Sequence, residues 1–200
     1  MDQDFDLTTV DLTTNGAAPP LPPDERERLE ALRRYGTFGM LRASVFDDIA
    51  RLAAFICRTP ISLITLIDAN HQWFLSQSGV GACETSREAS FCAHALFGPE
   101  MLIVEDAQTD ARFARNVMVT GEPFIRFYAG APLLTPDGYA LGTLCVVDSV
   151  PRVLAPEQRE SLQSLGHLVM TQLEMARMRR EPRALQQSFA PCLSSHGETP

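Results

Sequence analysis

The stretch from Ser90 to Val147 constrains the fold of this chain more than any other. Its run RFYAGAPL (Arg126 to Leu133) alternates large and small side chains, passes through a Thr-Pro-Asp-Gly turn and returns as YALGTLCVVD (Tyr139 to Asp148). Two alternating runs joined by such a turn predict a β-hairpin. Upstream, the run SFCAHALF (Ser90 to Phe97) predicts a helix that lies over this hairpin and brings a thiol and an imidazole to it.

Apolar periodicity predicts further strands and helices on either side of this stretch. The run ISLITLID (Ile61 to Asp68) has apolar residues in both alternating sets, which is typical of a strand covered on both faces. The other predicted elements are strands from Gln72 to Gly79 and from Met101 to Glu105, a short helix from Asp110 to Asn116, and helices from Asp24 to Gly36, from Ser44 to Arg58 and from Pro156 to about Arg180. A loop is expected between Gly79 and Ser90.

Both ends of the chain have compositions that disfavour a packed structure. Residues 1–23 are acidic and end in PPLPP, and residues 181–200 are polar and contain three prolines. We expect a disordered arm at residues 1–23, one globular domain at residues 24–180 and a disordered tail at residues 181–200. Because these ends are too short for a catalytic output domain, a signal is expected to pass to another protein.

The last predicted helix carries two apolar stripes. One consists of Leu162, Leu165, Val169, Leu173 and Ala176, and the other, roughly opposite, of Leu168, Met175 and Met178. A helix with two apolar faces needs two partners; the sheet is one, and a second copy of the same helix is the expected other. The sequence therefore predicts a homodimer held through this helix.

Charge and residue types exclude several classes of function. A formal net charge of -8 opposes nucleic-acid binding, which needs a clustered positive face. The chain contains no lysine, which excludes Schiff-base chemistry and a P-loop lysine. No apolar run is long enough to span a membrane, and the acidic N-terminus has none of the features of a signal peptide.

The cysteines indicate a reducing compartment. They are Cys57, Cys83, Cys92, Cys145 and Cys192, an odd number without Cys-x-x-Cys spacing. This pattern favours free thiols over a disulfide framework or a zinc site. A cytoplasmic protein without a metal centre is expected.

A series of short motifs resembles the GAF domain family, most closely the sensor modules of bacterial signalling proteins. In chain order the motifs are SFCAHA, EDA, DARFA, VTGEP, RFYAGAPL, PDG, LGTLCVVD and PEQ, and the resemblance covers about Leu29 to Arg180. It implies an α+β fold with a GAF/PAS-like central antiparallel β-sheet of five or six strands and helices on both faces. The implied function is sensory: the domain binds an unidentified small molecule, or senses redox state, in a pocket over the sheet, and signals through dimerisation or contact with a partner.

The predicted pocket residues come from the second strand, the covering helices and the hairpin. They are Trp73, Cys92, His94, Asp106, Arg112, Phe113, Arg126 and Tyr128. We expect them to line or border one pocket, because short and irregular covering elements leave room for one. Arg126 either binds an anionic ligand or forms an ion pair with Asp106 or Asp110. The sequence does not identify a cofactor.

Cys92 and His94 have several alternative roles. Cys92 is a buried small apolar side chain, a redox-active thiol, or the attachment point of a linear tetrapyrrole, as in the phytochrome-type members of the resembled family. In those members a histidine directly follows the cysteine, whereas Ala93 intervenes here and turns the imidazole about 100 degrees further round a helix. His94 is a structural histidine, a haem or iron ligand, or a pH sensor with a pKa of ~6.5.

Two other activities of the resembled family fit this sequence less well than a sensory function. Free methionine sulfoxide reductase uses clustered cysteines, and only Cys83 and Cys92 are expected near the pocket. Cyclic nucleotide binding in mammalian phosphodiesterases accompanies an Asn-Lys-Phe-Asp-Glu motif, which a chain without lysine lacks. The prediction is a sensor and not an enzyme, with a ligand-free scaffold for protein interaction or dimerisation as the alternative.

Overall fold

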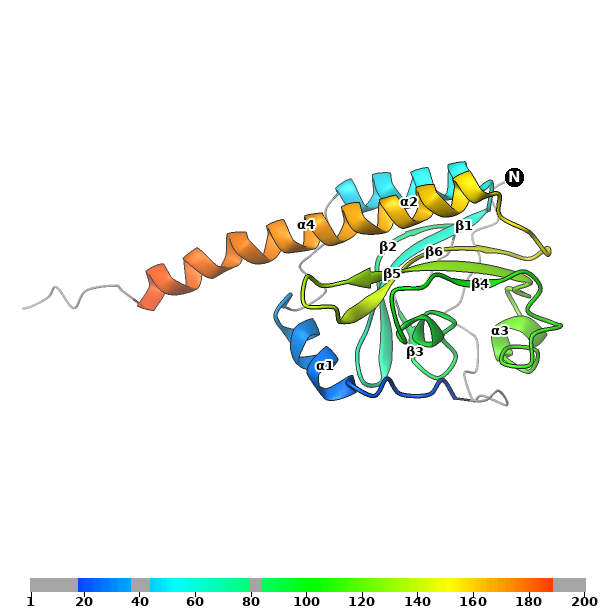
Figure 1. The fold of residues 1–200 in the computed structure, drawn as a ribbon, viewed down its shortest axis with the longest axis horizontal. Helices are drawn as coiled ribbons and strands as arrows, with labels where there is room; N and C mark the ends of the chain where they lie inside the picture. The colour runs from blue at the N-terminus through cyan, green and yellow to red at the C-terminus, as the bar shows by residue number, and fades with distance from the viewer. Residues whose placement is uncertain (1–17, 37–43, 80–83, 189–200) are drawn as a thin grey trace, which may run out of the picture.

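The chain folds around one six-stranded antiparallel β-sheet with the strand order β3-β2-β1-β6-β5-β4 (Figure 1). This computed structural model describes residues 18–36, 44–79 and 84–188. The strands are β1 (Ile61–Ile67), β2 (His71–Ser78), β3 (Glu84–Ser86), β4 (Leu102–Val104), β5 (Phe127–Leu134) and β6 (Ala140–Asp148). The helices are α1 (Glu25–Arg33), α2 (Ser44–Cys57), α3 (Val117–Thr120), α4 (Pro156–Ser188) and the 3-10 helix η3 (Cys92–Ala95). The predicted α+β fold, with helices on both faces of an antiparallel sheet, is confirmed.

The predicted hairpin forms β5 and β6, and β6 lies between β5 and β1. Every residue of β6 is buried, as is every residue of β5 except the last. Cys145 of β6 stands opposite Leu63 of β1 on one side and opposite Gly130 of β5 on the other. Because directly opposed residues of antiparallel strands point to the same face, these three positions share a face.

One face of the sheet, which we call the helix face, is covered by α1, α2 and α4. α2 and α4 run side by side across it (Figure 1). Ile64, Leu66 and Leu144 point to this face and form one buried cluster with helix residues such as Phe46 and Val169. The apolar stripes of α2 and α4 are therefore buried against the sheet, as expected for amphipathic helices.

A buried arginine fastens α1 to the sheet. Arg28 is 1% exposed, and its guanidinium donates to the backbone carbonyl oxygens of Ile67 (2.8 Å) and Ala140 (3.3 Å). The Glu25 carboxylate accepts from Arg28 at 2.7 and 3.0 Å and also pairs with Arg87. The buried charge is thus matched by a carboxylate and by strand-end carbonyls.

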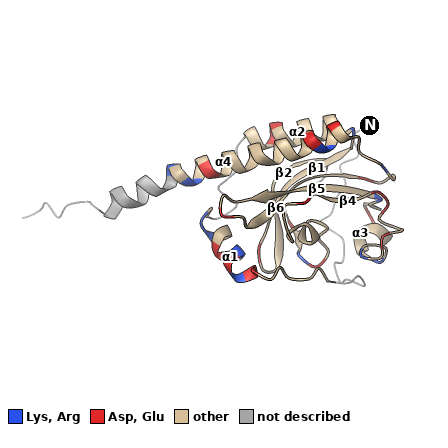
Figure 2. Cartoon of the chain, in the orientation of Figure 1, with Lys and Arg blue, Asp and Glu red and all other residues tan. Residues whose placement is uncertain are grey.

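The opposite face, which we call the cavity face, is covered by shorter elements. η3, α3 and the turns around β4 lie over it, and η3 and α3 have 4 residues each. Its buried cluster includes Leu63, Phe91, Phe113, Met118 and Tyr128. Figure 2 shows that charged residues gather on the helices and connecting turns, whereas the strands beneath them carry few.

The helix predicted from Ser90 to Phe97 is shortened to the 3-10 helix η3. The Ser90 hydroxyl accepts the amide of Ala93 at 3.0 Å, and the His94 amide bonds to the carbonyl three residues earlier at 3.1 Å. These i to i+3 bonds close a tighter helix than the predicted α-helix.

The helix predicted from Asp110 to Asn116 is a succession of turns. The Asp110 carboxylate accepts the amide of Arg112 at 2.9 Å, which fixes a local turn. α3 begins only after Asn116, whose side chain accepts the amide of Met118 at 2.9 Å and caps the helix.

Other element boundaries also differ from expectation. β3 was expected to be loop, and α4 runs to Ser188, past the predicted end near Arg180. Pro19 and Pro22, within the arm expected to be disordered, are buried. Of the two segments predicted to be disordered, residues 1–17 and 189–200 lie outside the described residues. None of the helices in the described ranges has the length and apolarity to cross a bilayer.

Candidate functional site

A small cavity lies between the cavity face of the sheet and its cover. Its volume is about 40 Å³, and strands β1, β2, β3, β5 and β6 together with η3 and α3 contribute to its walls. The lining includes Leu63, Gln72, Cys92, Met118, Tyr128 and Cys145. A cavity needs roughly 10–15 Å³ to hold one water, and drug-sized ligands occupy roughly 300–1,000 Å³. With its cover in this position, the space admits only a molecule of a few heavy atoms.

Two hydroxyl groups on the cavity wall are buried without a hydrogen-bond partner. They belong to Tyr128 of β5 and Thr85 of β3. The ring of Tyr128 extends over Gly130, where any side chain would collide with it. Burial raises the pKa of Tyr128 well above its ordinary value, so the phenol stays protonated and available as a donor. Unpaired buried polar atoms are rare in folded proteins and mark a place where a polar molecule fits.

Cys92 and Cys145 face each other across the cavity wall. Their Sγ atoms are 3.7 Å apart, and the two side chains are 2% and 0% exposed. Burial opposes ionisation of Cys92, but the hydrogen bond with the Cys145 thiol and the neighbouring hydroxyl groups of Thr143, Tyr128 and Thr65 outweigh it and lower the pKa of Cys92. The neighbouring Cys92 sulfur and burial raise the pKa of Cys145. The two thiols therefore titrate as a coupled pair, and the hydroxyl groups near Cys92 favour a thiolate on its side of the pair.

His94 does not line the cavity. Its ring packs edge-on against Phe113 with centroids 4.7 Å apart, and Phe113 in turn stacks on Phe91 at 4.1 Å. Burial, with the charge of Arg112, lowers the pKa of His94 to about 4. The imidazole is thus neutral near neutral pH and has the character of a structural histidine more than of a pH sensor.

The predicted arginines are held in ion pairs at the edge of the cavity face. Arg126 donates to both carboxylate oxygens of Asp106 at 2.8 and 2.7 Å. Arg112 forms the same kind of pair with Asp110, at 3.0 and 2.6 Å, and its guanidinium lies 5.1 Å from the ring centre of Phe113. Of the two roles left open for Arg126, the structure has the ion pair.

Trp73 lies on the wrong face for the predicted pocket. It stands opposite Leu66, which points to the helix face, so its side chain is on the side away from Cys92 and His94. Its indole nitrogen donates to Asp68 at 2.7 Å. The prediction that one pocket unites Trp73 with the other site residues is therefore wrong.

Sequence reasoning missed Gln72 and Cys145. Gln72 precedes Trp73 and so points to the cavity face, where it contacts the Ser90 hydroxyl. The sequence shows the alternation of side chains along β2. It does not show the pairing with β1, which decides which of the two alternating sets points to the cavity face. Cys145 was identified from the sequence as a free thiol but was not assigned to the pocket.

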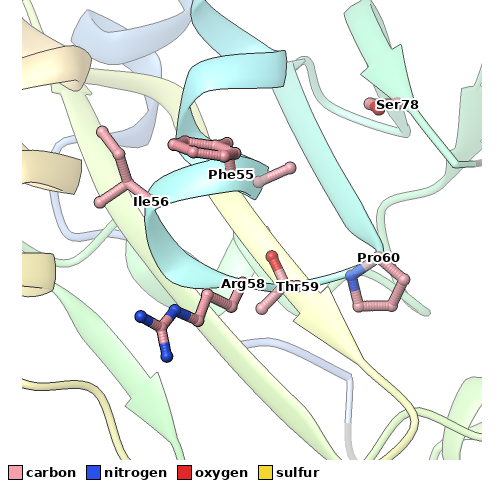
Figure 3. A pocket seen from close by; sticks show the side chains of 7 residues that line it. Phe55, Ile56, Arg58, Thr59, Pro60 and Ser78 are labelled. Carbon is pink, nitrogen blue, oxygen red and sulfur yellow. The ribbon is translucent and has the colours of Figure 1, made fainter.

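A larger hollow lies elsewhere, at the C-terminal end of α2 (Figure 3). Its volume is about 720 Å³, and its lining includes Phe55, Arg58, Thr59, Pro60 and Ser78. The hollow is open to solvent, and none of the predicted site residues lines it. In residues 18–36, 44–79 and 84–188, no three His, Cys, Asp or Glu side chains gather closely enough to hold a metal ion.

Comparison with known proteins places the chain among several relatives. The sequence model of the GAF domain family matches residues 26–173. A protein of Pseudomonas aeruginosa named cyclic di-GMP phosphodiesterase is 41% identical over 162 residues, which are 80% of this chain and 28% of that protein. The GAF domain of an Acinetobacter phosphoenolpyruvate-protein phosphotransferase is 16% identical with a TM-score of 0.56, covering 78% of this chain and 98% of that one. Free methionine-R-sulfoxide reductase from Neisseria meningitidis is 14% identical with a TM-score of 0.56, covering 78% and 91%.

The relative from P. aeruginosa corrects one prediction. The chain was expected not to be an enzyme, and a protein with 41% identity to it bears the name of an enzyme. The chain spans about 28% of the length of that relative. At 16% and 14% identity, the two solved structures show a shared fold alone.

Proposed function

We propose, from the premise that this chain belongs to the GAF domain family, that it is a sensory region in bacterial cyclic di-GMP signalling. The cavity between the sheet and η3 is the sensing site, and the activity under its control is cyclic di-GMP hydrolysis. The observation that carries the proposal is a small cavity bordered by two buried hydroxyl groups without partners. An unpaired buried hydroxyl costs stability, and a small polar molecule in the cavity would supply the missing partner.

The size of the cavity limits what it can sense. At about 40 Å³ it does not hold a tetrapyrrole, a haem or a nucleotide unless its cover moves. Cys92, the attachment point in the tetrapyrrole hypothesis, points at Cys145 inside this closed space. The ligand is therefore a molecule of a few heavy atoms, or a larger one that displaces η3 and α3.

The test compares the protein with Leu63→Phe, a variant whose larger side chain fills the cavity. Native mass spectrometry of protein purified from its host identifies a bound small molecule. That molecule should raise the melting temperature of the unmodified protein and change the rate of cyclic di-GMP hydrolysis by the phosphodiesterase under its control, and Leu63→Phe should lose both effects. Leu52→Phe, at a position of α2 that is 49% exposed, is the matched control. An unaltered response in Leu63→Phe would overturn the sensing site.

We propose that the output state is a homodimer joined through α4. Leu168, Met175 and Met178 are 49%, 39% and 53% exposed on this helix and form an apolar stripe that a second copy would cover. The combined change Met175→Glu and Met178→Glu should give a monomer in light scattering. The control is Val150→Glu with Val153→Glu, which alters exposed apolar residues away from the stripe. An unmodified protein that is monomeric at high concentration contradicts this proposal.

The same apolar stripe supports a second candidate function. In it the domain is a ligand-free scaffold for dimerisation or for binding a signalling partner. Under this function Leu63→Phe changes stability alone, and no small molecule alters melting in either protein.

We also propose a cytoplasmic location. Cys57, Cys92 and Cys145 are free thiols, which fits a reducing compartment. Fractionation of the host cells checks this, and recovery of the protein outside the cytoplasm contradicts it.

A further inference from the structure

We propose that Cys92 and Cys145 are a redox site, in which hydrogen peroxide entering the cavity converts the two thiols into a reversible disulfide. The residues are 53 positions apart in the chain, yet the fold brings their sulfur atoms to 3.7 Å. Cys92 begins η3, whereas Cys145 lies in the buried strand β6. Both border the same cavity.

The surroundings of the pair are polar in an otherwise apolar core. The hydroxyl of Thr143 lies 3.3 Å from that of Thr65, and these two groups and Tyr128 surround the sulfur of Cys92. Two cysteines that served only as small apolar residues would gain nothing from such neighbours. Hydroxyl donors stabilise a thiolate, which is the nucleophile in thiol oxidation.

Disulfide formation requires a small movement. A disulfide has sulfur atoms about 2.05 Å apart, so the pair must approach by about 1.7 Å. β6 is held between β1 and β5, whereas η3 is a 4-residue helix, so η3 is the element that moves. Phe91 and His94, on either side of Cys92, both contact Phe113, so the movement reaches the turn that contains Phe113.

The reaction consumes two thiols and one molecule of hydrogen peroxide and yields one disulfide and two waters. The Cys92 thiolate attacks one peroxide oxygen and the O–O bond breaks. Cys92 becomes a sulfenic acid, and the departing hydroxide takes up a proton to form water. The Cys145 thiol then loses its proton and attacks the Cys92 sulfur; the S–O bond breaks, a second water leaves and the S–S bond forms. Two electrons from the two thiols reduce the peroxide.

Access to the pair selects the oxidant by size. The two side chains are at most 2% exposed, and the adjoining cavity is about 40 Å³. Hydrogen peroxide has two heavy atoms and fits this space, whereas glutathione disulfide does not. The inference goes beyond the proposed function, because the disulfide forms or fails to form whether or not the domain controls cyclic di-GMP hydrolysis.

The test is peptide mapping of the folded full chain after treatment with hydrogen peroxide. Trypsin cleaves after arginine, and its sites place each of the five cysteines on a separate peptide. We expect a cross-linked pair of peptides carrying Cys92 and Cys145, which disappears on reduction with dithiothreitol. Glutathione disulfide should produce this cross-link at least tenfold more slowly. The variants Cys92→Ala and Cys145→Ala should each abolish it.

The matched control is Cys57→Ala. Cys57 is also a buried free thiol, but it belongs to the cluster on the helix face, and the cross-link should form unchanged without it. Circular dichroism of each variant confirms that it is folded. Three outcomes overturn the proposal: both thiols stay reduced, Cys92 pairs with another cysteine or forms only sulfinic acid, or glutathione disulfide reacts as fast as peroxide, which means that oxidation proceeds through unfolding.

Discussion

On the helix face, Leu66 and Leu144 are fully buried beneath long helices, whereas Leu63 and Cys145, from the same two strands, border an unfilled space on the cavity face. Because the same strands supply both faces, the difference lies in their covers. α2 and α4 have 14 and 33 residues, whereas η3 and α3 have 4 each. A long helix presents a continuous apolar stripe to a sheet, and a short turn cannot.

One pair of tyrosine hydroxyls differs between the two faces, although the buried Ser62 hydroxyl on the helix face also has no partner. The Tyr35 hydroxyl, in the cluster of the helix face, donates to the carboxylate of Glu174, while the Tyr128 hydroxyl on the cavity face has no partner. Unpaired buried groups lower stability and are retained where a protein binds or reacts. We infer that the helix face supplies most of the stability and the cavity face supplies the function.

The largest expected effect comes from shortening one leucine on each face of β1. Leu66→Ala should lower the free energy of unfolding by about 4 kcal/mol, because neighbours packed beneath helices cannot close the gap. Leu63→Ala should cost only about 2 kcal/mol, because a side chain beside an existing cavity makes fewer contacts to lose.

Urea denaturation of the two leucine variants measures this difference directly. The pair is matched in residue type, strand and substitution, so only the face differs. Equal costs would show that the cavity face is packed as tightly as the helix face, and the division between a stabilising and a functional face would fail.

The elements of the helix face were predictable from sequence because they are long enough to repeat. α2 begins at the predicted Ser44 and ends at Cys57, one residue before the predicted end, and the hairpin strands lie where alternation placed them. On the cavity face, β3, η3 and α3 have 3 or 4 residues, too few for a period to appear. There, hydrogen bonds from Ser90 and Asn116 decide the local structure.

The sequence predicted a site residue correctly where its own helix or strand determined its position. It failed where the position depended on the register between two paired strands. Cys92 and Tyr128 do border the cavity. Trp73 was assigned to the wrong face, because β1 is apolar in both alternating sets and its pairing with β2 contains an irregularity between Ile64 and Thr65. No local pattern brings Cys145 to Cys92, since only the assembled sheet and cover do so.

Tyr35 and Tyr128 test the difference between a paired and an unpaired hydroxyl. The expected change in the free energy of unfolding is smaller than for the leucines. Tyr35→Phe removes a hydrogen bond to a carboxylate and should cost about 1.5–3 kcal/mol of unfolding free energy. Tyr128→Phe removes a hydroxyl without a partner and should leave stability unchanged or raise it by about 1 kcal/mol. Thermal and urea unfolding give both values. A loss of stability in Tyr128→Phe as large as in Tyr35→Phe would show that the phenol has a structural partner.

The smallest expected effect concerns the ion pair of Arg126 with Asp106, at the edge of the cavity face. The hydrogen bonds from Arg126 hold the pKa of Asp106 below its ordinary 3.8. A carboxyl group with a lowered pKa stabilises the fold above pH 3.8, and that contribution disappears as the pH falls through the lowered value. In a carboxyl NMR titration, Arg126→Gln should return the pKa of Asp106 toward 3.8, whereas Arg112→Gln should move Asp110 and leave Asp106 unchanged. An anionic ligand that took Arg126 from Asp106 would raise the same pKa in the unmodified protein. A pKa of Asp106 that is indifferent to Arg126→Gln would show that this edge is held by other contacts.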